Sequence, residues 1–334
     1  MKNLKNNQPK VAVIGASGIG KNHARWFHQH GCEVVAFVGS SPESVARTRQ
    51  VLTEGFGFSG RGYAGIQTML EEVKPDIVCV STPSPQHFAQ VMACLQNGAH
   101  VLCEKPLVYD PELSSAELIA QAKQLVEEAK VHNLVFGTQM QYGPATTHLL
   151  QVAGVAASEV RDYEMVMETK NIKDERTFEQ IWVDLSPHPL SVLQKLAPNG
   201  EPQNIQATIS ERETQASFTL QGPNGPIEAR IAVRFDPQAN PPQRYFAFNG
   251  VRVGYTGRKN AGGEFVSFLT APDGSETELP DLVDLLIGEF VRACKGEIQV
   301  PVSGTEGAQN VAWQLKIKDE GRVPSSFKRP TWDR

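Results

Sequence analysis

The feature that most constrains the fold is a glycine-rich turn that directly follows an apolar run near the N-terminus. Residues 11–14 (Val-Ala-Val-Ile) are continuously apolar, as expected of a strand buried on both faces. The turn comes next and opens a predicted helix over residues 18–30. Backbone N–H groups at such a helix start can bind a dinucleotide pyrophosphate. We therefore predict cofactor contacts there, with a ligand-free tight turn as the alternative. The residues concerned are Gly15, Ser17, Gly18, Ile19 and Gly20.

The first 140 residues alternate short apolar runs with helical stretches. Strands are predicted at residues 11–14, 33–38, 76–81, 100–103 and 134–137. Strands that alternate with helices of this length pair in parallel through right-handed crossovers, which predicts a doubly wound sheet in an α/β fold. The clearest helix is predicted to begin at Asp110 and Pro111, a cap residue followed by proline at the first helical position.

After about residue 142 the pattern changes to one typical of an α+β domain with a large, mostly antiparallel open sheet. Asn224-Gly225 predicts a hairpin turn, and two helices are predicted at the end of the chain. Strands are expected at residues 160–167, 205–210, 216–220, 227–235, 245–248 and 265–270, and helices at 282–293 and 305–317. We predict a first domain over residues 9–140 and a second over 141–334, whose closing helices can pack back on the first.

Composition narrows the classes of function. The 334 residues carry a net charge of −5 and no basic cluster interleaved with aromatic residues, so a nucleic-acid surface is not expected. The polar N-terminus and the lack of a run of about 18 apolar residues predict neither a signal peptide nor a membrane helix. Five cysteines without C-x-x-C spacing indicate reduced thiols, a cytoplasmic protein and no metal site.

The end of the second predicted strand bears on the choice of cofactor. Proteins that prefer NAD usually place an acidic residue there, to bind the ribose hydroxyls. Here the strand runs into Ser40 and Ser41, and Arg47 follows on the next helix. This pattern favours NADP over NAD, with relaxed specificity as the alternative.

Two further motifs carry a resemblance to a known family. Thr82-Pro83-Ser84-Pro85-Gln86-His87 follows the third predicted strand, and Cys103-Glu104-Lys105-Pro106-Leu107 ends the next. They resemble the T-P-x-x-x-H and E-K-P signatures of the glucose–fructose oxidoreductase/inositol dehydrogenase (Gfo/Idh/MocA) family. The closing stretch is similar to that of the family as well, so the likeness runs from about residue 10 to 322. Its residues are Phe290, Gly296, Pro301, Ser303, Gly304 and Gly307.

The resemblance implies an N-terminal Rossmann domain, an open-sheet C-terminal domain and an active site in the cleft between them. It implies hydride transfer between NAD(P) and a CH–OH/C=O group of a sugar or cyclitol, and a homodimer or homotetramer formed through the C-terminal sheet. The family's catalytic set matches Lys105, Asp184 and His188. Further residues on the cofactor side would be Thr82, Pro83, His87, Glu104 and Lys105.

The chemistry explains this set. Hydride transfer at carbon needs proton transfer at the attached oxygen, which suits a histidine. A lysine ammonium can stabilise a developing alkoxide, and a carboxylate can orient both groups. If residues 184–188 are helical, their spacing places Asp184 and His188 on one face, although Pro187 makes that helix irregular or just beginning.

Two departures from the family pattern leave the substrate open. Many relatives carry arginines after the last Rossmann strand, where this chain has Met140 and Gln141, and an acid where this chain has Ser191. The alternatives are therefore a reductase of a C=N or conjugated bond, or a catalytically silent NAD(P)-binding sensor. A Rossmann-like methyltransferase is more distant, because its chemistry does not need the E-K-P lysine.

Overall fold

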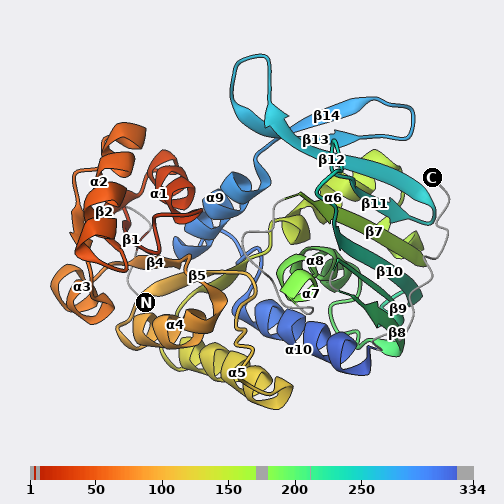
Figure 1. Ribbon diagram of the computed structural model, residues 1–334, viewed down its shortest axis with the longest axis horizontal. Coiled ribbons are helices and arrows are strands. Elements are labelled where there is room, and N and C mark those ends of the chain that lie inside the picture. Colours follow the sequence, from red (N-terminus) through yellow and green to blue (C-terminus); the bar gives the residue numbers. More distant parts are fainter. Residues whose placement is uncertain (1–3, 5–7, 171–179, 211, 322–334) are drawn as a thin grey trace. The chain divides into compact units, whose positions relative to one another are not determined.

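The computed structural model describes residues 4, 8–170, 180–210 and 212–321 of the chain. These residues form two compact units (Figure 1). The first unit extends to Ala145 and also contains Gly257–Ser267 and Leu279–Ala312. The second contains Thr146–Thr256, Phe268–Glu278 and the chain from Trp313.

The first unit is built on a parallel sheet of six strands in the order β3-β2-β1-β4-β5-β6. The strands are β1 Lys10–Ile14, β2 Glu33–Val38, β3 Arg61–Tyr63, β4 Ile77–Val80, β5 His100–Glu104 and β6 Phe136–Gln139. This is the doubly wound arrangement predicted from the sequence. The strand order reverses beside β1, so the carboxyl ends of β1 and β4 form the switch point at which such sheets bind ligands.

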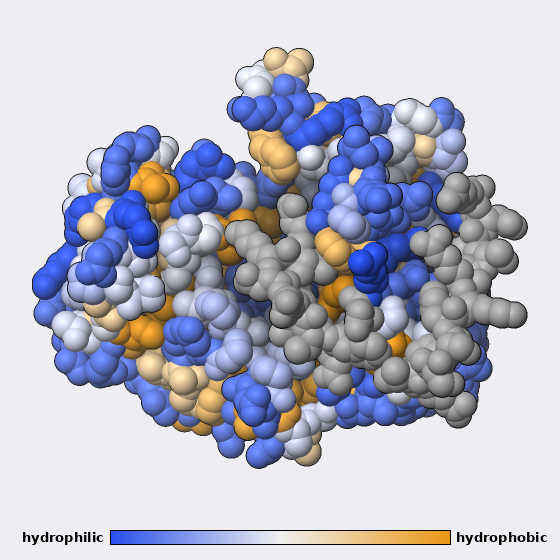
Figure 2. Space-filling model, in the orientation of Figure 1, coloured by the Kyte–Doolittle hydropathy of each residue, from blue (hydrophilic) through white to orange (hydrophobic). Residues whose placement is uncertain are grey.

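Helices connect these strands. They are α1 Gly20–Gln29, α2 Pro42–Phe56, α3 Ile66–Val73, α4 His87–Gln96 (preceded by the 3-10 turn η1 Ser84–Gln86) and α5 Ser115–Val131. Helix α9, Leu282–Cys294, packs against α1, and Phe27, Ile287 and Phe290 belong to one buried cluster. The visible surface of this unit is mostly hydrophilic, with apolar residues in small separate groups (Figure 2).

Helix α5 begins later than the sequence predicted. Its N-cap is Ser114, whose hydroxyl accepts the N–H of Glu117 while the Glu117 carboxylate accepts the N–H of Ser114. Asp110 instead accepts the N–H of Glu112 at 3.0 Å in a local turn. The prediction of a helix start at Asp110 was wrong because a reciprocal capping box satisfies two terminal N–H groups, whereas a single aspartate satisfies one.

The second unit is built on a mostly antiparallel sheet of eight strands in the order β14-β13-β12-β11-β7-β10-β9-β8, in which β7 and β10 are parallel. Its strands are β7 Asp162–Thr169, β8 Gln203–Ile209, β9 Glu213–Gly222, β10 Gly225–Phe235, β11 Arg244–Phe248, β12 Val251–Lys259, β13 Phe265–Thr270 and β14 Glu276–Pro280. The antiparallel open sheet was predicted, and β9 and β10 form the predicted hairpin. The polar strands β12 and β14 were missed.

One face of this sheet is buried and the other is not. Along β9 and β10 buried residues such as Phe218 and Ile231 alternate with partly exposed ones such as Ser217 and Arg230. Helix α7, Gln180–Leu185, packs on β9 and β10, and the Tyr163 hydroxyl donates to Pro189 O of α8, Pro187–Leu196. The remaining elements are α6 Tyr142–Ala153, η2 Ala157–Glu159 and α10 Gly304–Glu320. Among the described residues, every helix is too short or too polar to cross a membrane.

Candidate active site

The glycine turn after β1 is shaped by two positions that cannot carry a side chain. Gly15 has φ +85°, and a Cβ on it would lie 2.8 Å from the carbonyl oxygen of Ser81. A Cβ on Gly20 would lie 2.6 Å from the carbonyl oxygen of Gly15. The turn therefore presses against the end of β4, and glycine at both positions permits this close packing.

The start of α1 follows the glycine turn, and the residues just before it are exposed. Ile19 occupies the N-cap, no side chain among the described residues caps this end, and the first turn contains no acidic residue. Ser17, Gly18 and Ile19 are exposed, and a Cβ built on Gly18 would meet nothing within 4 Å. A helix start without a side-chain cap, with no acidic residue in its first turn and with open space at Gly18, suits a pyrophosphate.

A carboxylate that was not predicted to bear on the cofactor lies shortly after β2, on the first turn of α2. Ser40 is exposed, and Ser41 caps α2 by accepting the N–H of Ser44 at 3.2 Å. The Ser41 hydroxyl also hydrogen-bonds to Glu43 and lowers the pKa of that carboxyl, with a smaller contribution from Arg47. Both Glu43 and Arg47 are exposed on the first turns of α2. An acidic residue that binds the ribose was expected at the end of β2 itself, whereas Glu43 lies on helix α2.

Thr82 and Pro83 lie in the loop after β4, and His87 is the first residue of α4. The Thr82 hydroxyl donates to Gln90 at 2.6 Å, and its Cγ2 lies 2.9 Å from the position of a Cβ on Gly15. His87 is buried, with Nε2 2.8 Å from Thr82 O and Nδ1 2.9 Å from Pro106 O. Burial lowers the pKa of His87. Its ring therefore joins the loops after β4 and β5 from inside the protein, whereas Pro83 is exposed.

The loop after β5 contains Glu104 and Lys105. Lys105 is half-buried, and its backbone N–H donates to Glu104 Oε2 at 3.1 Å. The other oxygen of Glu104, Oε1, lies 3.3 Å from Nε2 of His23. His23 is fully buried, and this burial lowers its pKa to about 3. Sequence reasoning missed His23, although it lies three residues after Gly20, on the side of α1 that faces the sheet.

Asp184 and His188 lie on either side of a helix junction in the second unit. Asp184 is near the end of α7, and His188 is the second residue of α8. Between them Ser186 donates its N–H to Trp182 O at 2.8 Å, and its hydroxyl accepts from Gln314 at 3.0 Å. His188 is 5% exposed and Asp184 is half-buried. The interruption expected at Pro187 is present, because α8 begins there.

Ser191 is one position where the sequence departs from the family pattern, and Gln139 directly precedes the other, Met140-Gln141. The Ser191 hydroxyl is buried and donates to His188 O at 2.7 Å, so it stabilises its own helix. Gln139 is buried at the end of β6, in register with Glu104. Its Nε2 donates to Val283 O at 3.5 Å, and among the described residues its Oε1 has no hydrogen-bond partner. The side chains of Ser191 and Gln139 are both uncharged.

Within the described part of the chain, no group of three or more histidine, cysteine or acidic side chains is arranged to hold a metal ion. All five cysteines are free and buried.

The chain is similar to known oxidoreductases. Residues 9–140 match the Gfo/Idh/MocA model, described as an oxidoreductase family with an NAD-binding Rossmann fold. D-glucoside 3-dehydrogenase from Escherichia coli is 32% identical over 133 residues, which cover 39% of this chain and 34% of that protein. The match thus spans about a third of that relative. UDP-N-acetylglucosamine 3-dehydrogenase from Acidithiobacillus ferrooxidans is 27% identical over 231 residues, covering 67% of each chain.

Solved structures show the same fold over nearly the whole chain. The A. ferrooxidans enzyme superimposes with a TM-score of 0.72 at 19% identity, covering 93% of this chain and 97% of that one. A scyllo-inositol dehydrogenase from Lactobacillus casei, solved with NAD(H) and scyllo-inositol, gives 0.69 at 14% identity and covers 94% and 96%. Residues 9–140 of the chain are therefore similar to the Gfo/Idh/MocA oxidoreductase family with an NAD-binding Rossmann fold, and the whole chain shares the fold of the solved structures.

Proposed function

We propose that this protein is an NAD(P)-dependent oxidoreductase that transfers hydride between the nicotinamide and a CH–OH/C=O group of a sugar- or cyclitol-like molecule. The observation that carries the proposal is the position of Lys105. It follows β5 at the carboxyl edge of the sheet, the edge that also carries the glycine turn and the open start of α1. Ligands of doubly wound sheets bind at this edge.

The cofactor, when bound, supplies or accepts the hydride, and the chain's side chains handle charge and protons. The ammonium of Lys105 stabilises negative charge on the reacting oxygen. The imidazole of His188 gives or takes the proton of that oxygen, and Asp184 orients the imidazole or binds a neighbouring hydroxyl. The residues that would hold the pyrophosphate and nicotinamide ribose are those of the glycine turn with Thr82, Pro83, His87 and Glu104.

Turnover and binding assays test this proposal. NAD+ and NADP+ are offered with myo-inositol, methyl α-D-glucoside and UDP-N-acetylglucosamine, compounds that represent cyclitols, glycosides and nucleotide sugars. We expect one class to be oxidised, and Lys105→Met to lower kcat by about a hundredfold while NAD(P)H affinity changes little. Full activity of Lys105→Met would remove Lys105 from the mechanism. NAD(P)H binding with no turnover of any compound would favour the silent sensor.

A second candidate reaction is the reduction of a C=N or conjugated bond. The neutral side chains at Gln139, Met140 and Ser191 favour it over a site for an anionic sugar. Reduction of a cyclic imine by NADPH, without oxidation of any sugar in the panel, would select this reaction.

For the cofactor, we propose NADP. Ser40, Ser41 and Arg47 supply hydroxyls and a positive charge near the end of β2, where an NAD-specific protein has an acid. Glu43 is the opposing group, since its carboxylate would repel a 2′-phosphate. Fluorescence titration with NADPH and NADH distinguishes the two. Arg47→Gln is expected to weaken NADPH more than NADH, and Glu43→Gln to strengthen NADPH. Tighter binding of NADH by the unmodified protein would contradict the proposal.

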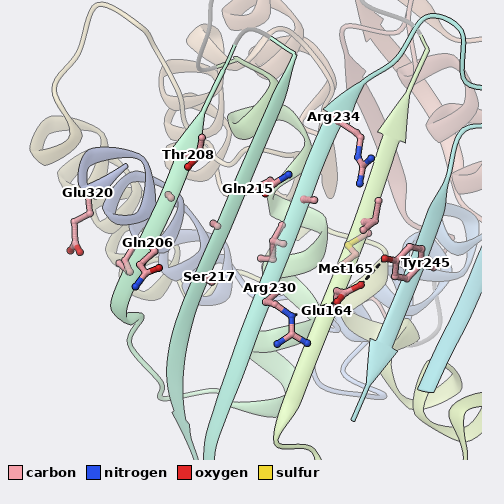
Figure 3. Close-up of a pocket in the computed structure, with 16 residues that line it drawn as sticks. Glu164, Met165, Gln206, Thr208, Gln215, Ser217, Arg230, Arg234, Tyr245 and Glu320 are labelled. Carbon is pink, nitrogen blue, oxygen red and sulfur yellow. Dashed lines mark hydrogen bonds and ion pairs between the residues drawn. The ribbon is translucent and has the colours of Figure 1, made fainter. Parts of the chain in front are cut away.

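We also propose that the protein assembles through the less covered face of the second unit's sheet. That face forms a hollow of about 740 Å³, lined by residues of β7 to β11 (Figure 3). Arg230 lies 2.8 Å from Asp162 and 3.5 Å from Glu164, and the Tyr245 hydroxyl donates to Glu164 at 2.6 Å. Paired charges beside small side chains suit the self-complementary interface of a homodimer or homotetramer.

Light scattering tests this surface. Ser217→Arg adds a positive charge beside Arg230, its neighbour in register on β10, and is expected to dissociate the oligomer. Glu127→Arg, on exposed helix α5, is the matched control and should leave the mass unchanged. A monomeric parent protein would refute the proposal.

The five buried free thiols fit a reducing compartment, and we propose the cytoplasm.

A further inference from the structure

His23 is a buried titratable residue that the proposed reaction does not use. Its ring is fully buried within the first unit. Nδ1 lies 3.0 Å from Ser81 Oγ and 3.3 Å from Cys79 Sγ, at the end of β4. Nε2 lies 3.3 Å from Oε1 of Glu104, at the end of β5. The ring thus connects the carboxyl ends of two neighbouring strands.

These contacts select one form of the ring. Ser81 and Cys79 can both donate a hydrogen to Nδ1, whereas a Glu104 carboxylate can only accept one from Nε2. A neutral imidazole with its proton on Nε2 presents an N–H to Glu104 and an acceptor to Ser81 and Cys79, and burial, which lowers the pKa of His23 to about 3, keeps the ring neutral. Oε1 lies 3.3 Å from Nε2, but among the described residues the Nε2–H makes no well-aligned hydrogen bond. Such contacts in ligand-free enzymes often tighten when the site fills.

The second carboxylate oxygen of Glu104 contacts the next residue, Lys105. Oε2 accepts the backbone N–H of Lys105 at 3.1 Å. We propose that His23 and Glu104 are positioning residues for Lys105: His23 orients the carboxylate, and the carboxylate fixes the backbone from which the lysine side chain extends. This inference rests on the proposed function, because it takes Lys105 as the catalytic residue.

The same network lies beneath the dinucleotide turn. Ser81, the hydrogen-bond partner of His23, has its Cβ 3.1 Å from the position of a Cβ on Gly20, and its carbonyl oxygen presses on Gly15. The contacts of His23 therefore link the segment that would hold the pyrophosphate with the segment that carries Lys105. A displaced ring is expected to loosen the Lys105 backbone first, since that contact depends on the carboxylate.

Two substitutions separate the two sides of the ring. His23→Gln keeps an N–H at about the position of Nε2 and can still donate to Glu104. The asparagine side chain is shorter, so His23→Asn keeps a polar group near Ser81 but loses the N–H that faces Glu104. The matched control is His100→Gln. His100 is a second buried histidine, at the opposite end of β5, where its Nδ1 accepts the N–H of Val135 at 2.9 Å.

Hydrogen exchange of the Lys105 amide, measured on the protein without cofactor, tests the inference independently of activity. We expect His23→Asn to speed this exchange about tenfold or more, and His23→Gln and His100→Gln to leave it within about twofold. Unchanged exchange in His23→Asn would overturn the inference. If His23→Asn does not fold, Glu104→Leu replaces it, since it removes both acceptors. Slow exchange of Lys105 in that variant would overturn the inference equally.

A double-mutant cycle adds the catalytic readout. With the most rapidly converted compound of the panel, His23→Asn should lower kcat about tenfold with little change in the KM for NAD(P)+, because it misplaces a catalytic group. In the Lys105→Met background it should have almost no further effect. Equal losses in both backgrounds would show a merely structural role. Full activity of Lys105→Met would refute the proposed function and leave the exchange result to stand on its own.

Discussion

At the scale of single residues, the glycine turn contains two glycines with opposite surroundings. A methyl group on Gly20 would lie 2.6 Å from Gly15 O, whereas one on Gly18 would meet nothing within 4 Å. Gly20 is therefore required by the protein itself, because its neighbours are backbone atoms that cannot move aside. Gly18 is not required by the protein, so any need for glycine there comes from a ligand.

This contrast gives a paired prediction. Gly20→Ala is expected to lower the free energy of unfolding by about 1–3 kcal/mol, as overpacking does. Gly18→Ala should change it by no more than about 0.5 kcal/mol, yet raise the Kd for NADPH and NADH about tenfold, because the added methyl stands where the pyrophosphate approaches. Urea unfolding and fluorescence titration measure the two quantities. Unchanged cofactor affinity in Gly18→Ala would show that the dinucleotide does not use this turn.

The candidate site was only partly predictable from the sequence. Gly15 was predicted because it follows an apolar strand directly, whereas Glu104 and Lys105 were predicted from the resemblance of Glu104-Lys105-Pro106 to the family's E-K-P signature. His23 was missed because its importance comes from Ser81 and Glu104, which are 58 and 81 residues away along the chain. No local pattern reports such a contact; the histidine within a helix gave no signal of its own.

At the scale of elements, α1 and α9 are joined by a half-exposed ion pair. His30 Nε2 lies 2.7 Å from Asp284 Oδ1, and the ring packs over Gly288. The hydrogen bond to Asp284, with the attraction of its charge, raises the pKa of His30, although partial burial opposes this. The folded protein therefore binds the His30 proton more tightly than the unfolded chain.

The contribution of His30 to the free energy of unfolding therefore depends on pH. A histidine with a raised pKa stabilises the fold fully below the unfolded value of 6.5, and this contribution is lost as pH rises through the folded pKa. We expect His30→Gln to cost about 0.5–1 kcal/mol of unfolding free energy at pH 5.5 and progressively less toward pH 9. Urea denaturation of the parent protein and the variant across this range measures the difference. A cost independent of pH would mean that only packing is lost.

The cap of α5 supplies a second prediction at this scale. Ser114 accepts the Glu117 N–H at 3.3 Å, and Glu117 returns the bond to the Ser114 N–H at 2.8 Å. Ser114→Ala should lower the free energy of unfolding by about 1 kcal/mol, and Asp110→Ala by less, because Asp110 caps no helix. Thermal unfolding of the two variants compares them. An equal loss in Asp110→Ala would mean that Asp110 stabilises the start of α5 as much as Ser114 does.

Most strands and helices were predictable because their apolar periodicity is local. The elements that were missed have a common reason. Strand β3 has only three residues, and β12 and β14 are rich in polar and charged side chains that pairing with neighbouring strands holds in place. The parallel pairing of β7 with β10 inside an antiparallel sheet was also beyond prediction, since it joins segments more than 60 residues apart.

At the scale of the whole molecule, the reactivity of the five thiols shows whether the first unit remains folded. All are buried. Burial raises the pKa of Cys32, Cys79 and Cys94 to about 12, and it also raises the pKa of Cys103 and Cys294 well above the usual value. Since the thiolate is the reactive form, none should react with a disulfide reagent while the fold is closed.

We therefore predict that fewer than one thiol per chain reacts with 5,5′-dithiobis(2-nitrobenzoate) within minutes at pH 8, and that all five react in guanidinium chloride. Val131→Cys, at an exposed position on α5 that is 69% accessible, is the control and should add one thiol that reacts at once. Because Cys79 and Cys103 lie on β4 and β5, Cys94 and Cys294 on α4 and α9, and Cys32 just before β2, the reaction of all five requires opening of the sheet and not of a single loop. Rapid reaction of one native thiol would locate a part of the first unit that opens independently of the rest.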